Sequence, residues 1–544
     1  MPDTAHSDVH MHDGRPAGLI NTRLKRIHNI WRTVRFALRV MNSLPWIILK
    51  KVGLGMRRRE NLWTDRCERP RGALGRREIR LFPWHLHTRS FASDPSCSDL
   101  RALQRYGSPK TAIVLLLAAA ALVSVARVNE SAHADPYNES LYEQFYTPPQ
   151  PLPSGRPGDL IRYEPARMVL EPSGQLGSFV GKGTRIMFRS NDAQGNPVVR
   201  TGLYIEPDAA WPGNGSRPLL AYSTLLYGMG EQCAPSRMFS QGIHASLNTG
   251  FDVWINLEET FVATLLARGF AIVVLDPAGL GLHEPQSPQL LNRTAMGATV
   301  LDGARAAMKL PGTSLDPHGP VAFWGWLIGA QAALAAAEMA ADYAPELNVV
   351  GTYAASSPTN LAEAIPSLDG NFWAGAAGWL LRGIMASYPQ LEQPIWDSLT
   401  PRGIEMLSNT GDQCTLQMGV DYMFRHFEGW FKNDVYETVK VDPFKNVLAA
   451  QRIGNVKPTG PVYFEHNRWD SFAPYTSVRD TARDWCAMGA DITFWTNEQP
   501  PFLNKLDINS FLPEFVDGER SMAWIADRFN GVPTTSNCAE IIGG

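Results

Sequence analysis

Five short runs of almost uninterrupted apolar residues constrain the fold of this chain more than any other feature. They occupy residues 219–223, 271–276, 321–324, 349–354 and 462–465. Strands have this composition when helices cover both faces of their sheet, as in parallel sheets. Helical stretches alternate with these runs, at residues 294–309, 330–343, 475–488 and 518–529. The alternation predicts an α/β fold with a mostly parallel sheet.

Two further segments refine this prediction. Residues 185–190 and 198–205 flank a turn-rich connection from Asn191 to Asn196, which indicates a β-hairpin. Residues 359–440 carry only helical patterns and loops, with apolar or amphipathic stretches at 372–387, 395–409 and 417–432. An insertion of this size predicts a helical cap over the strand ends. The cap is either a packed subdomain or a lid over an apolar ligand, because sites in open α/β sheets lie beyond the carboxyl ends of the strands.

The N-terminal part of the chain differs in charge from the rest. Residues 1–110 hold 22 of the 50 Lys and Arg but only 9 of the 53 Asp and Glu, so the remainder is acidic. An acidic body excludes nucleic acid as a partner. Residues 111–126 are uncharged and precede Ala132-His133-Ala134, so we expect a signal peptide over 111–134 with cleavage near Ala134 and a secreted protein. The alternative is a membrane anchor formed by residues 111–126.

The expected domain organisation follows from these boundaries. Residues 1–110 form a basic extension outside the mature fold, 135–358 and 441–544 are the two parts of the α/β domain, and 359–440 form the cap. Residues 135–157 are rich in Pro and Tyr and indicate an extended arm.

Cysteine usage supports an oxidising compartment. Cys233, Cys414, Cys486 and Cys538 follow the expected signal peptide, and four cysteines in an exported protein suggest two disulfides. Spacing does not fix their connectivity, although a Cys486–Cys538 bond would join the last strand to the last helix. No C-x-x-C pair occurs, so we expect neither a metal site nor a cofactor.

A strand, a tight turn and a helix follow one another at residues 321–343. The turn is Gly325-Trp326-Leu327-Ile328-Gly329, with a glycine two residues either side of Leu327. This is the frame of a nucleophile elbow, in which a catalytic side chain stands on a sharp strand-to-helix turn. The frame alone is weak evidence, since a close approach of strand and helix also explains two glycines.

Several segments of the chain, in order, resemble a known family. The matches include Phe145-Tyr146-Thr147-Pro148-Pro149, Gln232-Cys233-Ala234-Pro235-Ser236, and residues 265–274, 276–281, 300–307, 343–351 and 527–538. With them, the chain from about residue 143 to 538 resembles the secretory lipases, the lipase-A type of fungal and actinobacterial enzymes. The resemblance implies an α/β-hydrolase fold and hydrolysis of carboxylic esters of acylglycerols.

The family's catalytic triad runs Ser, Asp, His along the chain, and the resemblance places these roles on three residues. The nucleophile position falls on Leu327, the acid position on Asp470 and the base position on Ser510. The oxyanion donors fall on the backbone N–H of Ile328 and on the loop that begins at Thr224. Leu has no nucleophilic atom and Ser has no pKa near neutrality, so only the acid is retained.

These substitutions predict a catalytically silent member of the family that keeps a pocket for a lipid or acyl ester. Association with the cell envelope is a further expectation for such a protein. The alternative is an active triacylglycerol lipase or esterase whose catalytic residues have moved, with His466, four residues before Asp470, as the first histidine to test. The sequence does not determine the oligomeric state.

Overall fold

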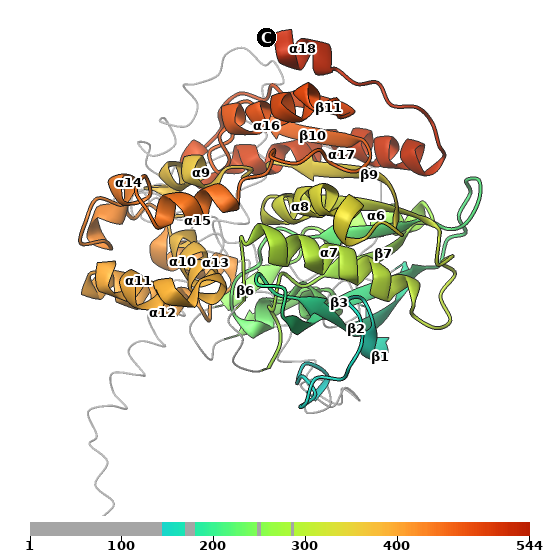
Figure 1. Cartoon of the computed structure of the whole chain (residues 1–544), viewed down its shortest axis with the longest axis horizontal. Coiled ribbons are helices and arrows are strands. Elements are labelled where there is room, and N and C mark those ends of the chain that lie inside the picture. The colour runs from blue at the N-terminus through green and yellow to red at the C-terminus, as the bar shows by residue number, and fades with distance from the viewer. Residues whose placement is uncertain (1–143, 169–179, 247–251, 284–287, 544) are drawn as a thin grey trace, which may run out of the picture. The chain divides into compact units, whose positions relative to one another are not determined.

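A nine-stranded mixed sheet runs through the described part of this computed structural model, which covers residues 144–168, 180–246, 252–283 and 288–543 (Figure 1). The strand order is β1-β2-β3-β7-β4-β8-β9-β10-β11. Neighbouring strands from β7 to β11 pair in parallel, whereas β1, β2 and β3 pair antiparallel at one edge. The predicted α/β fold with a mostly parallel sheet is confirmed.

The strands of this sheet are β1 (Leu160–Ala166), β2 (Gly181–Asn191), β3 (Pro197–Pro207), β4 (Leu219–Ser223), β7 (Ala271–Leu275), β8 (Pro320–Trp326), β9 (Asn348–Ala355), β10 (Val462–Asn467) and β11 (Ile492–Asn497). The five apolar runs are β4, β7, β8, β9 and β10, and the predicted hairpin is β2–β3. The sequence patterns missed β1 and β11 because edge strands are only partly buried and lack a continuous apolar run. A separate hairpin joins β5 (Ile243–Ser246) to β6 (Asp252–Ile255).

The segments predicted for the N-terminal part of the chain lie largely outside the residues that the structure describes. The expected basic extension 1–110, the expected signal peptide 111–134 and residues 135–143 of the arm lie outside the described residues. The described residues all belong to one compact unit, Glu130–Gly544. None of the described helices combines the length and apolarity that crossing a bilayer requires.

The helices of the α/β domain are α5 (Pro235–Gln241), α6 (Glu259–Ala267), α7 (Arg293–Met308), α8 (Ile328–Tyr343), α16 (Tyr475–Ala487), α17 (Ile508–Phe529) and α18 (Cys538–Gly543), with 3-10 turns η2 (Glu231–Cys233) and η5 (Asn504–Leu506). The predicted helix 518–529 is too short, because α17 begins ten residues earlier. Pro513 and Gly518 inside α17 hide its first half from the sequence pattern. This correction places Ser510 in the first turn of a helix.

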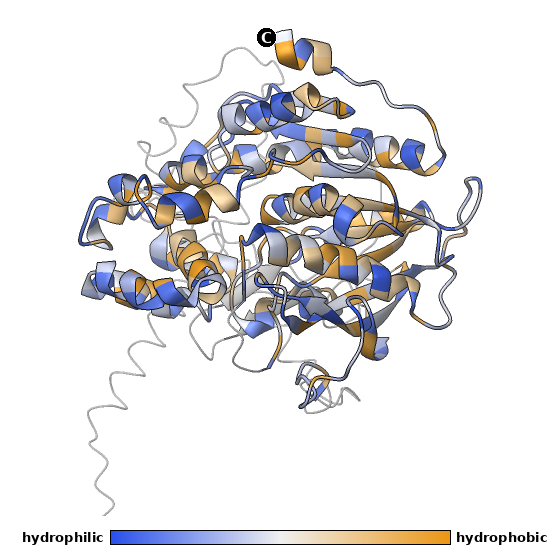
Figure 2. Cartoon of the chain, viewed as in Figure 1, coloured by the Kyte–Doolittle hydropathy of each residue, from blue (hydrophilic) through white to orange (hydrophobic). Residues whose placement is uncertain are grey.

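Helices cover both faces of the sheet. Successive side chains of a strand point to opposite faces. At the end of β8, a Cβ on Gly325 would meet Gly329 and Ala330 of α8, whereas the ring of the next residue, Trp326, packs on Phe511 of α17. Helices α8 and α17 therefore lie on opposite faces, and the apolar strands between them form the core (Figure 2).

The chain between β9 and β10 forms a cap of helices (Figure 1). Its helices are α9 (Leu361–Leu368), α10 (Ala376–Ser387), α11 (Glu392–Ser398), α12 (Pro401–Thr410), α13 (Thr415–Tyr422), α14 (Val435–Thr438) and α15 (Phe444–Ala450), with 3-10 turns η3 (Pro389–Leu391) and η4 (Phe427–Gly429). The stretch 395–409 is not one helix, because Thr400 caps α12 through Gly403 N–H and Pro401 starts it. Helix α15 continues the helical insertion beyond residue 440.

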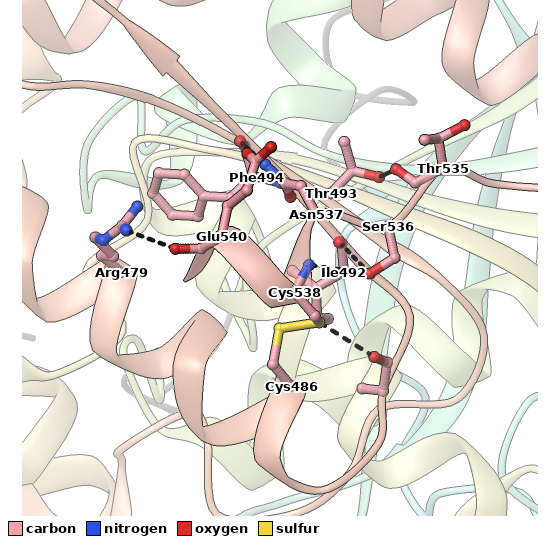
Figure 3. Close-up of a disulfide and its surroundings, with 11 residues drawn as sticks. Arg479, Cys486, Ile492, Thr493, Phe494, Thr535, Ser536, Asn537, Cys538 and Glu540 are labelled. Atoms are coloured by element: carbon pink, nitrogen blue, oxygen red, sulfur yellow. Dashed lines mark hydrogen bonds between the residues drawn. A yellow bond between two sulfur atoms is a disulfide. The ribbon is translucent and has the colours of Figure 1, made fainter. Parts of the chain in front are cut away.

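Two disulfides connect parts of the fold that lie far apart in sequence. Cys233–Cys414 spans 181 residues and joins the cap, just before α13, to the segment that follows β4. Cys486–Cys538 joins α16 to α18 (Figure 3). The segment before Cys538 also pairs with the edge strand β11, where Asn537 exchanges side-chain hydrogen bonds with the backbone of Phe494 at 2.8 and 3.0 Å. This segment covers the open edge of the sheet.

We expect the two disulfides to stabilise different parts of the molecule. In the chain-entropy model, closing loops of these lengths contributes about 4–5 kcal/mol each to the free energy of unfolding. Replacing Cys233 and Cys414 by Ala should speed hydrogen exchange in α13 and in the loop after β4. The Cys486→Ala, Cys538→Ala variant is the matched control and should speed exchange in α18 and β11 instead. Identical exchange patterns in the two variants would contradict this assignment.

Candidate functional site

The turn between β8 and α8 has the geometry of a nucleophile elbow, and Leu327 stands at its apex. Leu327 has φ 51° and ψ −115°, a conformation that costs a non-glycine residue of order 1–3 kcal/mol. Its N–H donates to the carbonyl of Ala355 at 3.0 Å. A Cβ on Gly325 would lie 2.2 Å from the carbonyl oxygen of Gly329, and one on Gly329 would lie 2.0 Å from that of Ser223. Both glycines are therefore required by close backbone contacts.

The side chain of Leu327 lies in an apolar cavity beneath the cap. Leu327 is only 1% exposed. The cavity has a volume of about 30 Å³ and is lined almost entirely by hydrocarbon and aromatic side chains, contributed by Leu226, Leu291, Leu327, Ile328, Pro358, Leu361, Ala364, Ile365, Leu368, Trp373, Ala376, Trp379, Leu380 and Phe472. A second apolar cavity of about 60 Å³ lies within the cap and shares Ile365, Leu368 and Leu380 with the first. The two cavities adjoin through these shared residues.

The residues at the acid and base positions are hydrogen-bonded to each other. Asp470 follows β10, and its Oδ1 accepts the N–H groups of Phe472 and Ala473 at 2.8 Å. The Oγ of Ser510, in the first turn of α17, lies 2.7 Å from the same oxygen. The carbonyl of Ser510 accepts Nε1–H of Trp326 at 3.2 Å, so this turn of α17 is held beside the elbow. The structure thus brings Leu327, Asp470 and Ser510 into one region.

Asp507 is a third member of this cluster that the sequence patterns did not single out. Its Oδ1 lies 2.6 Å from the Oγ of Ser510 and 2.5 Å from that of Ser471, and its Oδ2 accepts Nε1–H of Trp373 at 2.6 Å. Asp507 is fully buried at the start of α17 in a left-handed conformation, with φ 58°. Its position three residues before Ser510, one helical turn away, was the only signal in the sequence.

The cluster must hold an additional proton. The hydroxyl of Ser510 has one hydrogen but contacts two carboxyl oxygens, so a second proton has to lie between the three groups. Burial, together with the negative charge of Asp470, raises the pKa of Asp507 well above its ordinary value. Burial thus favours the protonated form of Asp507, whose proton would bridge to Ser510 while the Ser510 hydroxyl donates to Asp470.

The expected oxyanion donors lie beside the elbow. Ile328 is the first residue of α8, where backbone N–H groups have no partner within the helix. Thr224 follows β4, and its carbonyl would lie 2.4 Å from a Cβ on Gly329, so the two segments are in contact. The Oγ1 of Thr224 is buried without a hydrogen-bond partner. The pairing of Ile328 and Thr224 as donors remains a prediction.

His466 is buried at the end of β10 but has no serine partner. Its Nε2 lies 2.9 Å from the carbonyl oxygen of Ala473 and 3.7 Å from Oδ2 of Asp470. Its Nδ1 is buried without a hydrogen bond. Ser356, which follows the neighbouring strand β9, donates to the carbonyl of Ser510 at 2.9 Å. The geometry at His466 gives no imidazole–hydroxyl pair.

Three other serine and histidine side chains in the described part of the chain are engaged in contacts away from the elbow. Ser236 hydrogen-bonds to Asp276 and Tyr146 in a buried cluster that fixes the N-terminal arm. His283 and His426 are exposed and pair with Glu231 and Asp369, respectively. The described residues also contain no group of three His, Cys, Asp or Glu side chains suited to a metal ion.

Known proteins resemble this chain over most of the described fold. A sequence model of the family described as "Secretory lipase" matches residues 244–537. A secreted triacylglycerol lipase of Malassezia furfur is 25% identical over 75% of this chain and 79% of its own length. A probable inactive lipase of Mycobacterium tuberculosis is 25% identical over 73% of this chain and 83% of its own length. The crystal structure of Candida antarctica lipase A superposes with a TM-score of 0.62 at 21% identity, covering 74% of this chain and 89% of that one.

The protonated state of Asp507 predicts how stability depends on pH. A carboxyl group whose pKa is raised on folding contributes stability that is fully present below its unfolded pKa and is lost as pH rises toward its folded pKa. Asp507→Asn keeps the neutral side chain but removes this titration. From pH 4 upward, the stability of the variant relative to the natural protein should increase by up to about 1.4 kcal/mol per pH unit.

Urea unfolding of both proteins at several pH values measures this difference. Other titrating groups, including buried Glu259, whose pKa burial raises to about 9, occur in both proteins and cancel in the comparison. A pH-independent difference would show that Asp507 is ionised in the folded state.

Proposed function

This chain belongs to the secretory lipase family, and on that premise we propose that it is a catalytically silent member that binds the hydrocarbon chain of a lipid or acyl ester beneath its cap. The observation that carries the proposal is the hydrocarbon side chain at the apex of the elbow. Ester hydrolysis in this fold begins with attack by an oxygen at that point, and Leu327 has none. The name of the mycobacterial relative, a probable inactive lipase, agrees with this proposal.

The loss at the base position supports the same conclusion. A general base needs a pKa near the working pH in order to take and return a proton, and a serine hydroxyl lacks it. Ser510 is instead fixed between two carboxyl groups, one of them protonated. Loss of the nucleophile or the base typically lowers turnover about 10⁶-fold. Backbone oxyanion donors and substrate binding alone would leave no useful lipase.

Binding does not need the lost groups. The cavity at Leu327 and the cavity within the cap are lined by apolar side chains of the kind that shelter an alkyl chain from water, and they share three of these residues. Leucine at position 327 and Ile328 beside it make the elbow end of the first cavity apolar as well. The ligand class we propose is therefore a lipid or acyl ester with at least one long hydrocarbon chain.

We place the protein outside the cell. Several relatives are named as secreted lipases, and the two disulfides are compatible with an oxidising compartment. In this proposal residues 111–134 are removed as a signal peptide, with cleavage near Ala134. N-terminal sequencing of exported protein tests it, since retention of residues 111–126 would instead support a membrane tether and association with the cell envelope.

Restoring both lost groups should restore chemistry. The variant Leu327→Ser, Ser510→His places a hydroxyl on the strained turn and an imidazole next to Asp470. We expect it to hydrolyse p-nitrophenyl esters at least about 10³-fold faster than either single variant, because the nucleophile and base act as a unit. Labelling by a fluorophosphonate should appear in the double variant and not in the natural protein. Stoichiometric labelling of the natural protein would overturn the proposal in favour of an active esterase with relocated residues.

Ligand binding should depend on the residues shared by the two apolar cavities. Leu380→Trp adds a large ring at such a position, and we expect it to weaken binding of a fluorescent long-chain fatty acid at least tenfold. Gln393→Trp adds the same ring on the exposed surface of α11 and serves as the matched control. Equal affinities in a fluorescence titration, with both variants folded by circular dichroism, would show that the ligand does not enter these cavities.

A further inference from the structure

A second, polar hollow lies on the other side of the cap helix α10. It has a volume of about 540 Å³ and lies between the β2–β3 turn, the start of β3 and the last turns of α10. Its lining residues are Asp192, Gln194, Asn196, Val198, Arg200, Gln289, Arg382, Met385, Ala386, Pro389 and Glu392. None of these residues lines the apolar cavities, which use Leu380, Leu381 and Ile384 of the same helix. The hollow is therefore separate from the elbow and its cavity.

Arg200 brings a buried positive charge to this hollow without an ion pair. Its side chain is 2% exposed. Nε donates to Oγ1 of Thr299 at 3.3 Å and Nη1 to the carbonyl of Val199 at 3.0 Å, and Nη2 donates to no group among the described residues. Burial lowers the pKa of Arg200 to about 10, so the group stays charged at neutral pH. A buried charge without a counter-ion is costly to a fold.

The nearest acidic groups are committed to other partners. Asp302 accepts hydrogen bonds from Ser190 and Tyr343 and pairs with Arg305 at 2.8 Å. Asp192 accepts the N–H groups of Gln194 and Asn196 at 2.8 Å within its own turn. Both carboxylates favour the charged form of Arg200 from a distance, but neither lies within 4.0 Å of it as an ion pair would require.

Arg382 presents a second guanidinium to the same hollow. Its Nε and Nη2 donate to the carbonyls of Leu407 and Ser408 at 2.8 and 3.0 Å, which fixes the plane of the group. Within the described part of the chain, Arg382 forms no ion pair and its Nη1 donates no hydrogen bond. Burial lowers the pKa of Arg382 as well.

The backbone carbonyl groups at the C-terminal end of α10 would repel an anion in this hollow. Two of these carbonyl groups, however, accept hydrogen bonds from side chains. Gln289 Nε2–H donates to the carbonyl of Ala386 at 3.2 Å, and Gln194 Nε2–H donates to that of Ser387. These bonds reduce the negative potential at this end of the helix. The remaining acid in the lining, Glu392, lies at the exposed rim.

We propose that this hollow binds an oxyanion, a carboxylate or a phosphate, between Arg200 and Arg382. Guanidinium groups bind both anions through paired N–H···O bonds, and each arginine has an N–H group available. The anion supplies the counter-ion that Arg200 lacks. It is carried either by a small free acid or by the head group of an amphiphile. The site does not depend on the silent elbow and would function in an active enzyme equally well.

Thermal unfolding and calorimetry of the purified protein test this site at constant ionic strength, with sodium phosphate or sodium succinate against sodium chloride. We expect saturable stabilisation by phosphate or succinate. Arg200→Met should weaken binding at least tenfold without lowering the melting temperature of the unliganded protein, because it removes an unpaired buried charge. Arg200→Lys keeps the charge but not the paired donors and should bind with intermediate affinity.

The controls separate this site from general electrostatics. Arg382→Met should weaken binding, whereas Arg468→Met, which removes a surface arginine paired with Glu498, should leave binding unchanged. Tighter binding of monododecyl phosphate than of inorganic phosphate would identify an amphiphile as the source of the anion, and equal binding would identify a free acid. Stabilisation by chloride equal to that by phosphate and succinate, or binding to Arg200→Met equal to that of the natural protein, would overturn the proposal.

Discussion

The strained turn at Leu327 is the constraint on which the site depends. Positive φ at a leucine is retained because the backbone around it has no room to relax: Gly325 and Gly329 each lie against backbone carbonyls, and the Leu327 N–H is tied to the next strand. In an active hydrolase the same strain exposes an oxygen. In this chain the strained turn directs the hydrocarbon side chain of Leu327 into the cavity under the cap. The turn therefore contributes apolar surface to that cavity.

Ser510, which the resemblance to the family places at the base position, lies in a polar cluster. A serine is much smaller than an imidazole, and the space around Ser510 is bounded by the carboxyl groups of Asp470 and Asp507. Two carboxylates so close together would repel each other in a buried environment. One proton removes that repulsion and links Asp470 through Ser510 and Asp507 to Trp373 of the cap. The acid position is thus preserved as part of a structural hydrogen-bond network that joins α17 to the cap.

Helix α10 divides the cap into two chemically different environments. One side of the helix lines apolar cavities that adjoin the elbow, and the other presents Arg382 to a polar hollow that also contains buried Arg200. Helix α10 borders both the apolar cavities and the polar hollow. A ligand in either one would therefore contact α10. A lipid and an anion would therefore bind to the same rigid cap, which the disulfide between Cys233 and Cys414 holds to the loop after β4.

The sequence by itself determined the sheet and the elbow, because both depend on local patterns. Buried parallel strands are continuous apolar runs, and the turn at Leu327 requires glycines at fixed spacing. The start of α17, the edge strand β11 and the break within 395–409 were hidden, since Pro513 resembles a helix breaker and edge strands are only partly apolar. Only the tertiary structure decided that Asp507 shares a proton with Ser510 and Asp470, and that Arg200 and Arg382, 182 residues apart, line one hollow. Burial and the absence of a counter-ion are properties of packing between distant segments, which no local pattern encodes.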